Sequence, residues 1–220
     1  MGMPDRQQLL SELDRIAGAS SFGALVDSTL NLLDTTLEAD LVSYNEMDFD
    51  RGTASVVLRP YLERQALAVD AVARYLAEHP VFQWYDQHPG WAPARMSDTI
   101  GFDELRASRL YREDLDPIGA RFSTFIPLSP FTGSGTWVYL AVNRASSDFT
   151  DSELRFAVDV QPALVSVFRA FNRIASSAVA VTRGNCRCFW RWRMEIPRRR
   201  SAADSASASG PSTSTWRTSI

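Results

Sequence analysis

The apolar positions near the amino terminus repeat with the period of an α-helix. One such stretch runs from Pro4 to Ala17, and a second follows Ser20-Ser21, a pair of residues typical of helix caps. The pattern predicts two amphipathic helices, each with one face toward a core. The repeating positions are Leu9, Leu10, Leu13 and Ile16 in the first stretch, and Phe22, Leu25, Val26, Leu30 and Leu33 in the second.

Short segments rich in Val, Leu, Tyr and Thr predict four strands in two hairpins. Residues 41–47 and 53–59 flank Asp48-Phe-Asp-Arg-Gly52, a polar turn that ends in glycine. Residues 122–128 and 136–143 are joined by a short loop, so an antiparallel pair is the simplest arrangement for them.

The chain between the two hairpins divides into a regular and an irregular part. Residues 61–78 are alanine-rich and predict a helix that stops before Pro80. Residues 79–119 are aromatic and are interrupted by Pro and Gly, so only residues 102–107 and 110–115 predict short helices there.

A capping box opens the last predicted helix. Thr150-Asp-Ser-Glu153 begins an apolar stripe that continues to about Arg173, and a kink is expected at Pro162. Strands that are separated by helices but paired as hairpins indicate an α+β fold with one antiparallel sheet and helices on both sides. We therefore expect a single domain over residues 5–175, in which the amino-terminal helices and the last helix pack together on one sheet face.

The charge is divided between this body and the remaining tail. Residues 1–175 contain 15 Arg and 24 acidic residues, a net charge of −9, whereas residues 176–220 contain 8 Arg and 2 acidic residues, a net charge of +6. All 23 basic residues are arginine, which we attribute to a GC-rich genome. Because the tail is also rich in Ser and Ala, we expect residues 176–220 to be disordered.

The sequence lacks the residue patterns of the common enzyme and metal sites. No G-x-S-x-G, H-E-x-x-H, Walker or dinucleotide-binding pattern is present. His79 and His88 adjoin prolines and are interpreted as structural, and Cys186-x-Cys188 has no second ligand pair to hold zinc. We therefore expect no catalytic residue, no metal and no cofactor. Because no long apolar run and no secretion signal is present, we also expect a cytoplasmic protein without a membrane-inserted segment.

Aromatic residues concentrate between residues 82 and 139. Core packing accounts for those on the strands, whereas irregular segments over a sheet also form concave sites lined by aromatic side chains. Both interpretations stay open: a filled core makes the domain a dimerisation module, and a cavity takes a small ligand of unknown identity. The side chains that we expect to line such a cavity are Trp84, Tyr85, Met96, Tyr111, Phe122 and Phe125.

The order of elements is similar to that of GAF domains, small sensory domains in which an antiparallel sheet carries a ligand pocket on one face. Several motifs further resemble the amino-terminal sensory region of actinobacterial LuxR-type transcription regulators. The resemblance implies a signal-sensing function, a homodimer, and a carboxy-terminal helix-turn-helix of about 60 residues that binds DNA. The motifs are His79-Pro-Val-Phe-Gln-Trp-Tyr85, Met96-Ser-Asp98, Leu110-Tyr-Arg-Glu113, Ile118-Gly-Ala-Arg-Phe122, Leu140-Ala-Val-Asn-Arg144 and Asp148-Phe-Thr-Asp-Ser-Glu153.

The tail does not contain that helix-turn-helix as translated. If the reading frame moves back by one nucleotide, residues 203–216 permit RRLGISVRTVHKHL and residues 190–201 permit LALADGDTAAAI, which together resemble the recognition half of a LuxR-type helix-turn-helix. We interpret the tail as an out-of-frame remnant, with the slip near residues 182–184, and expect specific DNA binding only from the frame-restored protein.

Codon degeneracy leaves an alternative, in which the tail is a native extension. The chain is then a stand-alone GAF-like module that binds a small molecule or dimerises, without DNA binding. A small enzyme is the remaining rival, and the missing catalytic patterns disfavour it.

Overall fold

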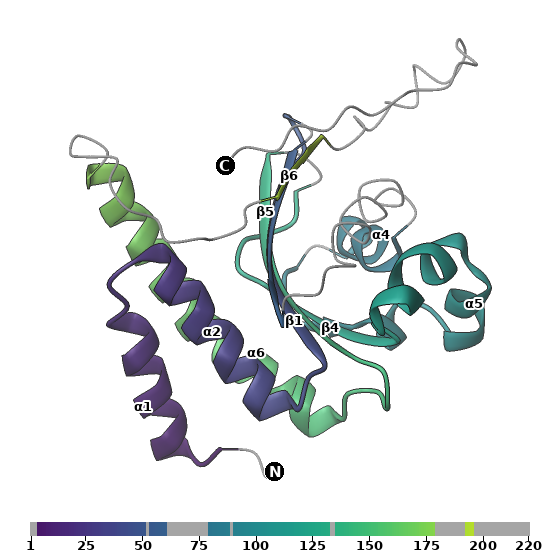
Figure 1. Ribbon diagram of the computed structural model, residues 1–220, viewed down its shortest axis with the longest axis horizontal. Coiled ribbons are helices and arrows are strands. Elements are labelled where there is room, and N and C mark those ends of the chain that lie inside the picture. Colours follow the sequence, from purple (N-terminus) through teal and green to yellow (C-terminus); the bar gives the residue numbers. More distant parts are fainter. Residues whose placement is uncertain are drawn as a thin grey trace.

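The computed structural model describes residues 4–51, 53–60, 79–88, 90–132, 135–178 and 192–195. Its centre is one antiparallel sheet with the strand order β3-β4-β5-β1-β2-β6 (Figure 1). The fold is therefore α+β, as predicted, with helices on both sides of a single antiparallel sheet. The strands are β1 (Leu41–Asp48), β2 (Thr53–Arg59), β3 (Ala94–Arg95), β4 (Phe122–Pro127), β5 (Thr136–Arg144) and β6 (Trp192–Glu195).

Both predicted hairpins are present. β1 pairs with β2 up to the Asp48–Thr53 pair, and the turn is held by a 2.8 Å hydrogen bond from Arg51 N to Asp48 Oδ1. β4 pairs with β5 in antiparallel register from Phe122 to Pro127. β1 also pairs with β5 along its whole length, which joins the two hairpins and gives β1 a neighbour on each side.

The first two helices begin at the capping residues that the sequence offers. α1 (Arg6–Ala17) follows Asp5, whose side chain accepts a 2.8 Å hydrogen bond from Gln8 N. α2 (Phe22–Leu37) follows Ser21, whose hydroxyl accepts a 3.1 Å hydrogen bond from Ala24 N. These bonds satisfy backbone donors that a helix start leaves without an intrahelical partner.

The last helix is longer than expected. In α6 (Asp151–Ala178) the predicted capping box is formed, because Glu153 N donates to Thr150 Oγ1 while Thr150 N donates to Glu153 Oε2. The helix is continuous through Pro162 and extends beyond the expected end at Arg173.

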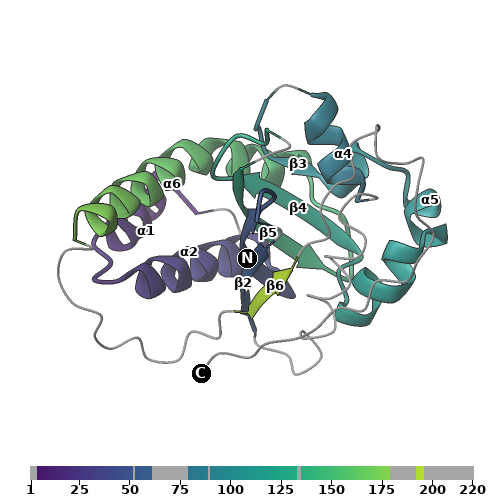
Figure 2. The ribbon, with the colours of Figure 1, turned by 90° about the horizontal axis from the view of Figure 1, so that it is seen from above.

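The helices form two layers with the sheet between them. Figures 1 and 2 show α2 and α6 against one face with α1 packed on their outer side, and α4 (Pro80–Gln87) and α5 (Phe102–Ala107) against the other face. The predicted packing of the amino-terminal helices with the last helix on one face is confirmed. Their core with the sheet is mostly aliphatic, and examples are Ile16, Leu25, Leu33, Leu140, Val142 and Leu164. The helix predicted over residues 61–78 lies outside the described residues.

The middle segment is more regular than the sequence predicts. α5 is present as predicted, and the predicted 110–115 helix is found as a π-helical turn over Tyr111–Leu115. α4 and the two-residue strand β3 were not predicted. Pro80 occupies the first turn of α4, where the missing backbone N–H costs no hydrogen bond, so a residue that suggests irregular chain instead starts a helix.

One short part of the tail is also regular. The sequence predicts disorder for residues 176–220, whereas β6 pairs antiparallel with β2 from Thr53–Glu195 to Val56–Trp192. Without β6, β2 would be the edge strand of the sheet in the described chain. The free backbone groups of an edge strand can pair with any extended segment, so the side-chain pattern of residues 192–195 does not predict this pairing. Among the described residues, no helix is both long and apolar enough to cross a membrane.

Candidate functional site

Alternate residues of each strand point to opposite faces of the sheet, and the two faces differ in kind. On β5, Leu140 and Val142 belong to the core with α1, α2 and α6, while Trp137, Tyr139 and Ala141 belong to the core with α4 and α5. We call the first side the helical face and the second side the aromatic face. The aromatic face is the candidate functional site.

The aromatic face is built from rings that contact one another. Trp137 stacks on Tyr139 with the ring centroids 4.3 Å apart, and Phe125 on β4 lies 5.9 Å from Tyr139. α4 places Phe82 and Tyr85 edge-on to Trp137, at 5.1 and 5.5 Å. These rings form one buried cluster, because an eight-residue helix presents Phe82 and Tyr85 on the same side at i, i+3 spacing.

Four of the six predicted lining residues come together in this cluster. Tyr85, Met96, Tyr111 and Phe125 are all buried on the aromatic face. The Tyr85 hydroxyl donates a 2.8 Å hydrogen bond to the carbonyl of Ala92, and burial raises the pKa of Tyr85. The sequence therefore identified residues that do share one region of space.

The other two predicted residues are placed differently. Trp84 is half-buried at the rim, where its ring lies 4.9 Å from Tyr85 and 4.6 Å from His88. Phe122 packs with the helical-face core and stacks on Phe102 at 5.5 Å at the edge of the sheet. Phe122 and Phe125 are three positions apart on one strand, an odd spacing, so their side chains point to opposite faces.

His79 is a polar group inside the aromatic cluster. The residue is only 4% exposed, and its ring lies 4.5 Å from Phe82 and 5.7 Å from Phe125. Its Nδ1 atom has no hydrogen-bond partner, and burial lowers the pKa of His79 to about 3. The imidazole is therefore neutral at physiological pH. The sequence interpretation treated His79 as structural and did not assign it to the candidate site.

A row of neutral polar side chains continues the aromatic face along the sheet. Ser43 and Asn45 on β1 alternate with helical-face residues, and Asn143 lies opposite Ser123 in the β4–β5 register. All four are buried. Asn45 Nδ2 donates to Ser43 Oγ at 2.9 Å, and Ser123 Oγ donates to Asn143 Oδ1 at 2.7 Å. Sequence reasoning missed this row, although its signal is visible as polar residues at every second position of a buried strand.

Charged side chains beside this face are exposed rather than buried, including Asp98 and Asp116 near Tyr85 and Tyr111. Among the described residues, the one buried charged side chain is Arg144, which ion-pairs with Glu153 at 2.5 Å and lies over the ring of Phe149. The part of the chain that the structure describes contains no group of three or more His, Cys, Asp or Glu side chains that could hold a metal ion. The aromatic face can thus offer hydrogen bonds and apolar contact but no buried countercharge within its described residues.

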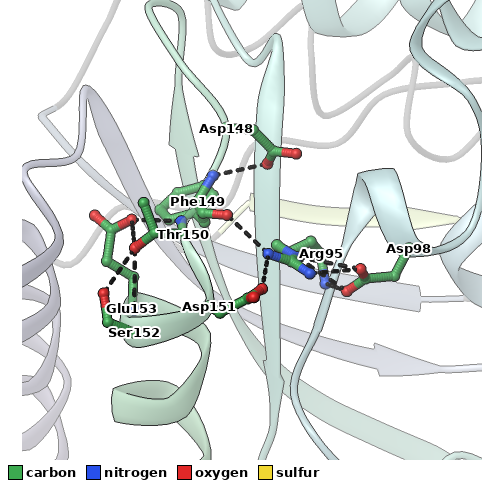
Figure 3. A network of polar contacts seen from close by, with 8 residues as sticks. All are labelled: Arg95, Asp98, Asp148, Phe149, Thr150, Asp151, Ser152 and Glu153. Carbon is green, nitrogen blue, oxygen red and sulfur yellow. Dashed lines mark hydrogen bonds and ion pairs between the residues drawn. The ribbon is translucent and has the colours of Figure 1, made fainter.

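One segment connects the aromatic face to α6, and we call residues 91–98 the strap. Figure 3 shows Arg95 at its centre, between Asp98 and the start of α6. The guanidinium donates from Nη1 to the Phe149 carbonyl at 3.0 Å and to Asp151 Oδ1 at 2.8 Å, and from Nη2 to Asp98 Oδ1 at 2.9 Å. The neighbouring residue Met96 is buried in the aromatic cluster. The strap therefore ties this cluster to the first turn of α6.

The other end of the strap contacts α6 as well. Gln161 Nε2 donates to the Trp91 carbonyl at 2.6 Å and to the Pro127 carbonyl at 2.7 Å. The guanidinium of Arg169 lies 5.5 Å from the centre of the Trp91 ring, which packs with the helical-face core. The strap thus passes from one face of the sheet to the other around the β4 edge and is bonded to α6 at two separate levels.

Comparison with known proteins identifies the fold. No protein-family model matches the chain, and no curated protein matches it in sequence. The fold is similar to that of the ligand-binding domain of VqsR from Pseudomonas aeruginosa, with a TM-score of 0.56, 12% identity, and coverage of 74% of this chain and 97% of that one.

Two further solved structures have the same fold. The N-acylhomoserine lactone dependent LuxR family transcription factor CepR2 from Burkholderia cenocepacia has a TM-score of 0.52 at 15% identity, covering 76% of this chain and 97% of that one. The GAF domain of a phosphoenolpyruvate-protein phosphotransferase from Coxiella burnetii has a TM-score of 0.51 at 13% identity, covering 79% and 99%. The likeness shows a fold common to LuxR-type ligand-binding domains and GAF domains.

Proposed function

We propose that residues 5–175 form the signal-sensing domain of a LuxR-type transcription regulator, and that its small-molecule ligand binds at the aromatic face. The observation that carries this proposal is the asymmetry of the sheet, because the aromatic face gathers rings and neutral polar groups while the helical face is mostly aliphatic, with a smaller group of rings around Tyr44 and Phe168. Binding sites for small molecules are mostly apolar with a few placed polar groups. The fold shared with VqsR and CepR2 supports the same function, and we propose no catalytic activity.

We propose that ligand binding is communicated to α6 through the strap. Met96 lies in the aromatic cluster, and the adjacent Arg95 bonds the first turn of α6. A ligand that binds one arrangement of this segment better than another shifts the equilibrium by its difference in affinity. α6 leads directly to the segment in which the DNA-binding unit of such a regulator is expected.

For the tail, we propose that residues 183–220 are the out-of-frame remnant of an actinobacterial LuxR-type helix-turn-helix. The chain as translated then lacks specific DNA recognition and retains weak, salt-sensitive attraction through its 8 arginines. The nucleotide sequence across codons 176–225 tests this directly. A single-base correction that yields no continuous helix-turn-helix frame would show that the tail is a native extension.

For assembly, we propose a cytoplasmic homodimer, in which α1 and α6 form the contact surface. Two large apolar side chains support this surface, since Leu10 on α1 is 53% exposed and Val158 on α6 is 43% exposed. The test is the solution mass at micromolar concentration, by light scattering, of the protein and of the variants Leu10→Glu and Val158→Glu. A monomeric mass for the unmodified protein contradicts the proposal.

Thermal unfolding with a panel of neutral acyl compounds tests the sensory function, beginning with N-acylhomoserine lactones of several chain lengths. A ligand at about 100 times its Kd stabilises the folded state by about 2.7 kcal/mol. This raises the Tm of a domain of this size by about 5–10 °C. The matched variant Leu10→Ala, on the far side of the helical layer, should show the same shift.

The alternative function is a stand-alone GAF-like dimerisation module without DNA binding. The fold shared with a GAF domain favours it, as does a translated tail that has no helix-turn-helix pattern. If no compound of the panel shifts the Tm while the protein remains dimeric, this alternative replaces the sensory function.

A further inference from the structure

We propose that His79 anchors the ligand of the aromatic face, and that this ligand is an uncharged molecule with an apolar or aromatic body and a hydroxyl or similar hydrogen-bonding group. The inference rests on the proposed sensory function and adds to it the chemical class of the ligand and the residue that recognises it.

The first step of the argument is the position of His79. The residue immediately precedes α4, yet its side chain makes no capping hydrogen bond to that helix. It is 4% exposed, with the ring against the rings of Phe82 and Phe125. A histidine in this position contributes nothing to helix capping and little to packing that a phenylalanine would not contribute. Its polar atoms therefore need another explanation.

The second step is the missing hydrogen bond. Among the described residues, three buried side-chain polar atoms have no partner, namely His79 Nδ1, Thr124 Oγ1 and Arg144 Nε. Arg144 is already paired with Glu153, and Thr124 lies on the helical face by its alternation with Phe125. His79 Nδ1 is thus the unpartnered atom on the aromatic face. Because buried polar groups are nearly always bonded, a ligand atom is the natural partner for it.

The third step is the charge of the ligand. His79 is neutral at physiological pH, because burial lowers its pKa to about 3. We assign the proton of the neutral imidazole to Nε2, so Nδ1 accepts a hydrogen bond and a ligand hydroxyl is the donor that satisfies it. The buried polar side chains Ser43 and Asn45, which lie on the same face of the sheet, are also neutral. A carboxylate or ammonium would have to be buried on this face without a countercharge, which is strongly unfavourable.

Three probes with the same ring system test separately whether the ligand needs a hydroxyl and whether it must be uncharged. 2-Naphthol carries a hydroxyl, 2-methoxynaphthalene carries the same oxygen without the proton, and 2-naphthoate carries a charge. Their dissociation constants are measured at pH 7 by calorimetry or by quenching of tryptophan fluorescence. The proteins are the unmodified chain, the variant His79→Phe, and the control His88→Gln, which changes the exposed histidine at the other end of α4.

The unmodified protein should bind 2-naphthol about tenfold more tightly than 2-methoxynaphthalene, as expected for one buried hydrogen bond. 2-Naphthoate should bind at least about tenfold more weakly than 2-naphthol. In His79→Phe the two neutral probes should bind equally within about twofold, whereas His88→Gln should keep the tenfold difference. His79→Phe should unfold at a Tm no lower than that of the unmodified protein, because it removes an unbonded polar atom from an aromatic cluster.

Each other outcome has one meaning. A tenfold preference for 2-naphthol that survives in folded His79→Phe overturns the anchor role of His79 and leaves the sensory function standing. Tight binding of 2-naphthoate overturns the assignment to uncharged ligands. If neither neutral probe binds the unmodified protein while acyl compounds still raise its Tm, the anchor role of His79 fails and the sensory function stands; if the acyl compounds also have no effect, the sensory function fails as well.

Discussion

The two faces of the sheet share the same strands but differ in what their side chains need. On the helical face, aliphatic residues such as Leu140 and Val142 are satisfied by contact alone. On the aromatic face, Trp137 and Tyr139 from the same strand lie beside neutral polar groups, and His79 has an unbonded nitrogen. Because aliphatic contacts account for most of the helical face, we interpret that face as a structural core. Among the described residues, each face contains one neutral side chain with an unbonded buried atom, Thr124 on the helical face and His79 on the aromatic face, and the whole imidazole of His79 lies among the rings.

The largest expected effect comes from the helical face. Leu140→Ala removes a side chain that is fully buried between β5 and the helices, so the free energy of unfolding should fall by about 2–5 kcal/mol in urea denaturation. The ratio of naphthol to methoxynaphthalene affinity should be unchanged in the protein that remains folded. A loss below about 1 kcal/mol would show that the helical face is loosely packed, and the contrast between the faces would fail.

The next effect concerns pH and belongs to the aromatic face. The folded-state pKa of His79 is about 3 and its ordinary value is 6.5, so the unfolded chain gains a proton that the folded chain does not. The stabilising contribution is fully present above pH 6.5 and is lost progressively as the pH falls toward 3. Between pH 7 and 5 we expect a loss of about 1–2 kcal/mol in the free energy of unfolding.

The control for this prediction is the variant that cannot titrate at residue 79. His79→Phe should be less sensitive to pH than the unmodified protein by that amount, while His88→Gln should follow the unmodified protein. Equal pH slopes for the unmodified protein and His79→Phe would contradict the buried, neutral state of His79.

A smaller effect is expected where the two faces are joined. Arg95→Ala removes the bonds from the strap to the Phe149 carbonyl and Asp151, and should lower the free energy of unfolding by about 1 kcal/mol. Hydrogen exchange should rise in residues 91–98 and 149–155 but not in α2. Arg51→Ala, whose side chain is 82% exposed, is the matched control and should change nothing measurable. Uniform faster exchange throughout the domain would argue against a local link.

The smallest effect is expected from one hydroxyl on the aromatic face. Tyr85→Phe removes the hydrogen bond to the Ala92 carbonyl and keeps the ring in place, so the free energy of unfolding should fall by about 0.5–1 kcal/mol. Urea denaturation measures this change, and Tyr85→Phe should bind the naphthalene probes like the unmodified protein. A tenfold loss of 2-naphthol affinity would move the anchor role from His79 to Tyr85.

Local patterns along the sequence predicted the regular elements well. The strand-forming composition of residues 41–47 and 136–143 and the capping box at Thr150 were sufficient, because these signals depend on neighbours in the chain. The grouping of Tyr85, Met96, Tyr111 and Phe125 was also foreseen, since aromatic residues in a short stretch over a sheet have few places to be buried.

The features that were missed depend on contacts between distant segments. β3 is only two residues long and is held by backbone pairing with β4. β6 is held in the same way by pairing with β2. Phe122 was assigned to the wrong face of the sheet. Its odd spacing from Phe125 on the same strand already places the two side chains on opposite faces. The unbonded nitrogen of His79 is invisible in a sequence, because it is defined by the absence of any partner in three dimensions.

Because α6 is long, a small change in its direction at the strap displaces its carboxy-terminal end by a larger distance. The helix has 28 residues, which corresponds to about 42 Å at 1.5 Å per residue. Hydrogen bonds from the strap reach the helix at Asp151 and Gln161, both in its first half, while Phe168 in its second half stacks on Tyr44 of β1. A tilt of about 5° at the bonded end moves the far end by about 4 Å over this length. A change at the aromatic face too small to alter the sheet can therefore be large enough to reposition whatever is attached beyond Ala178.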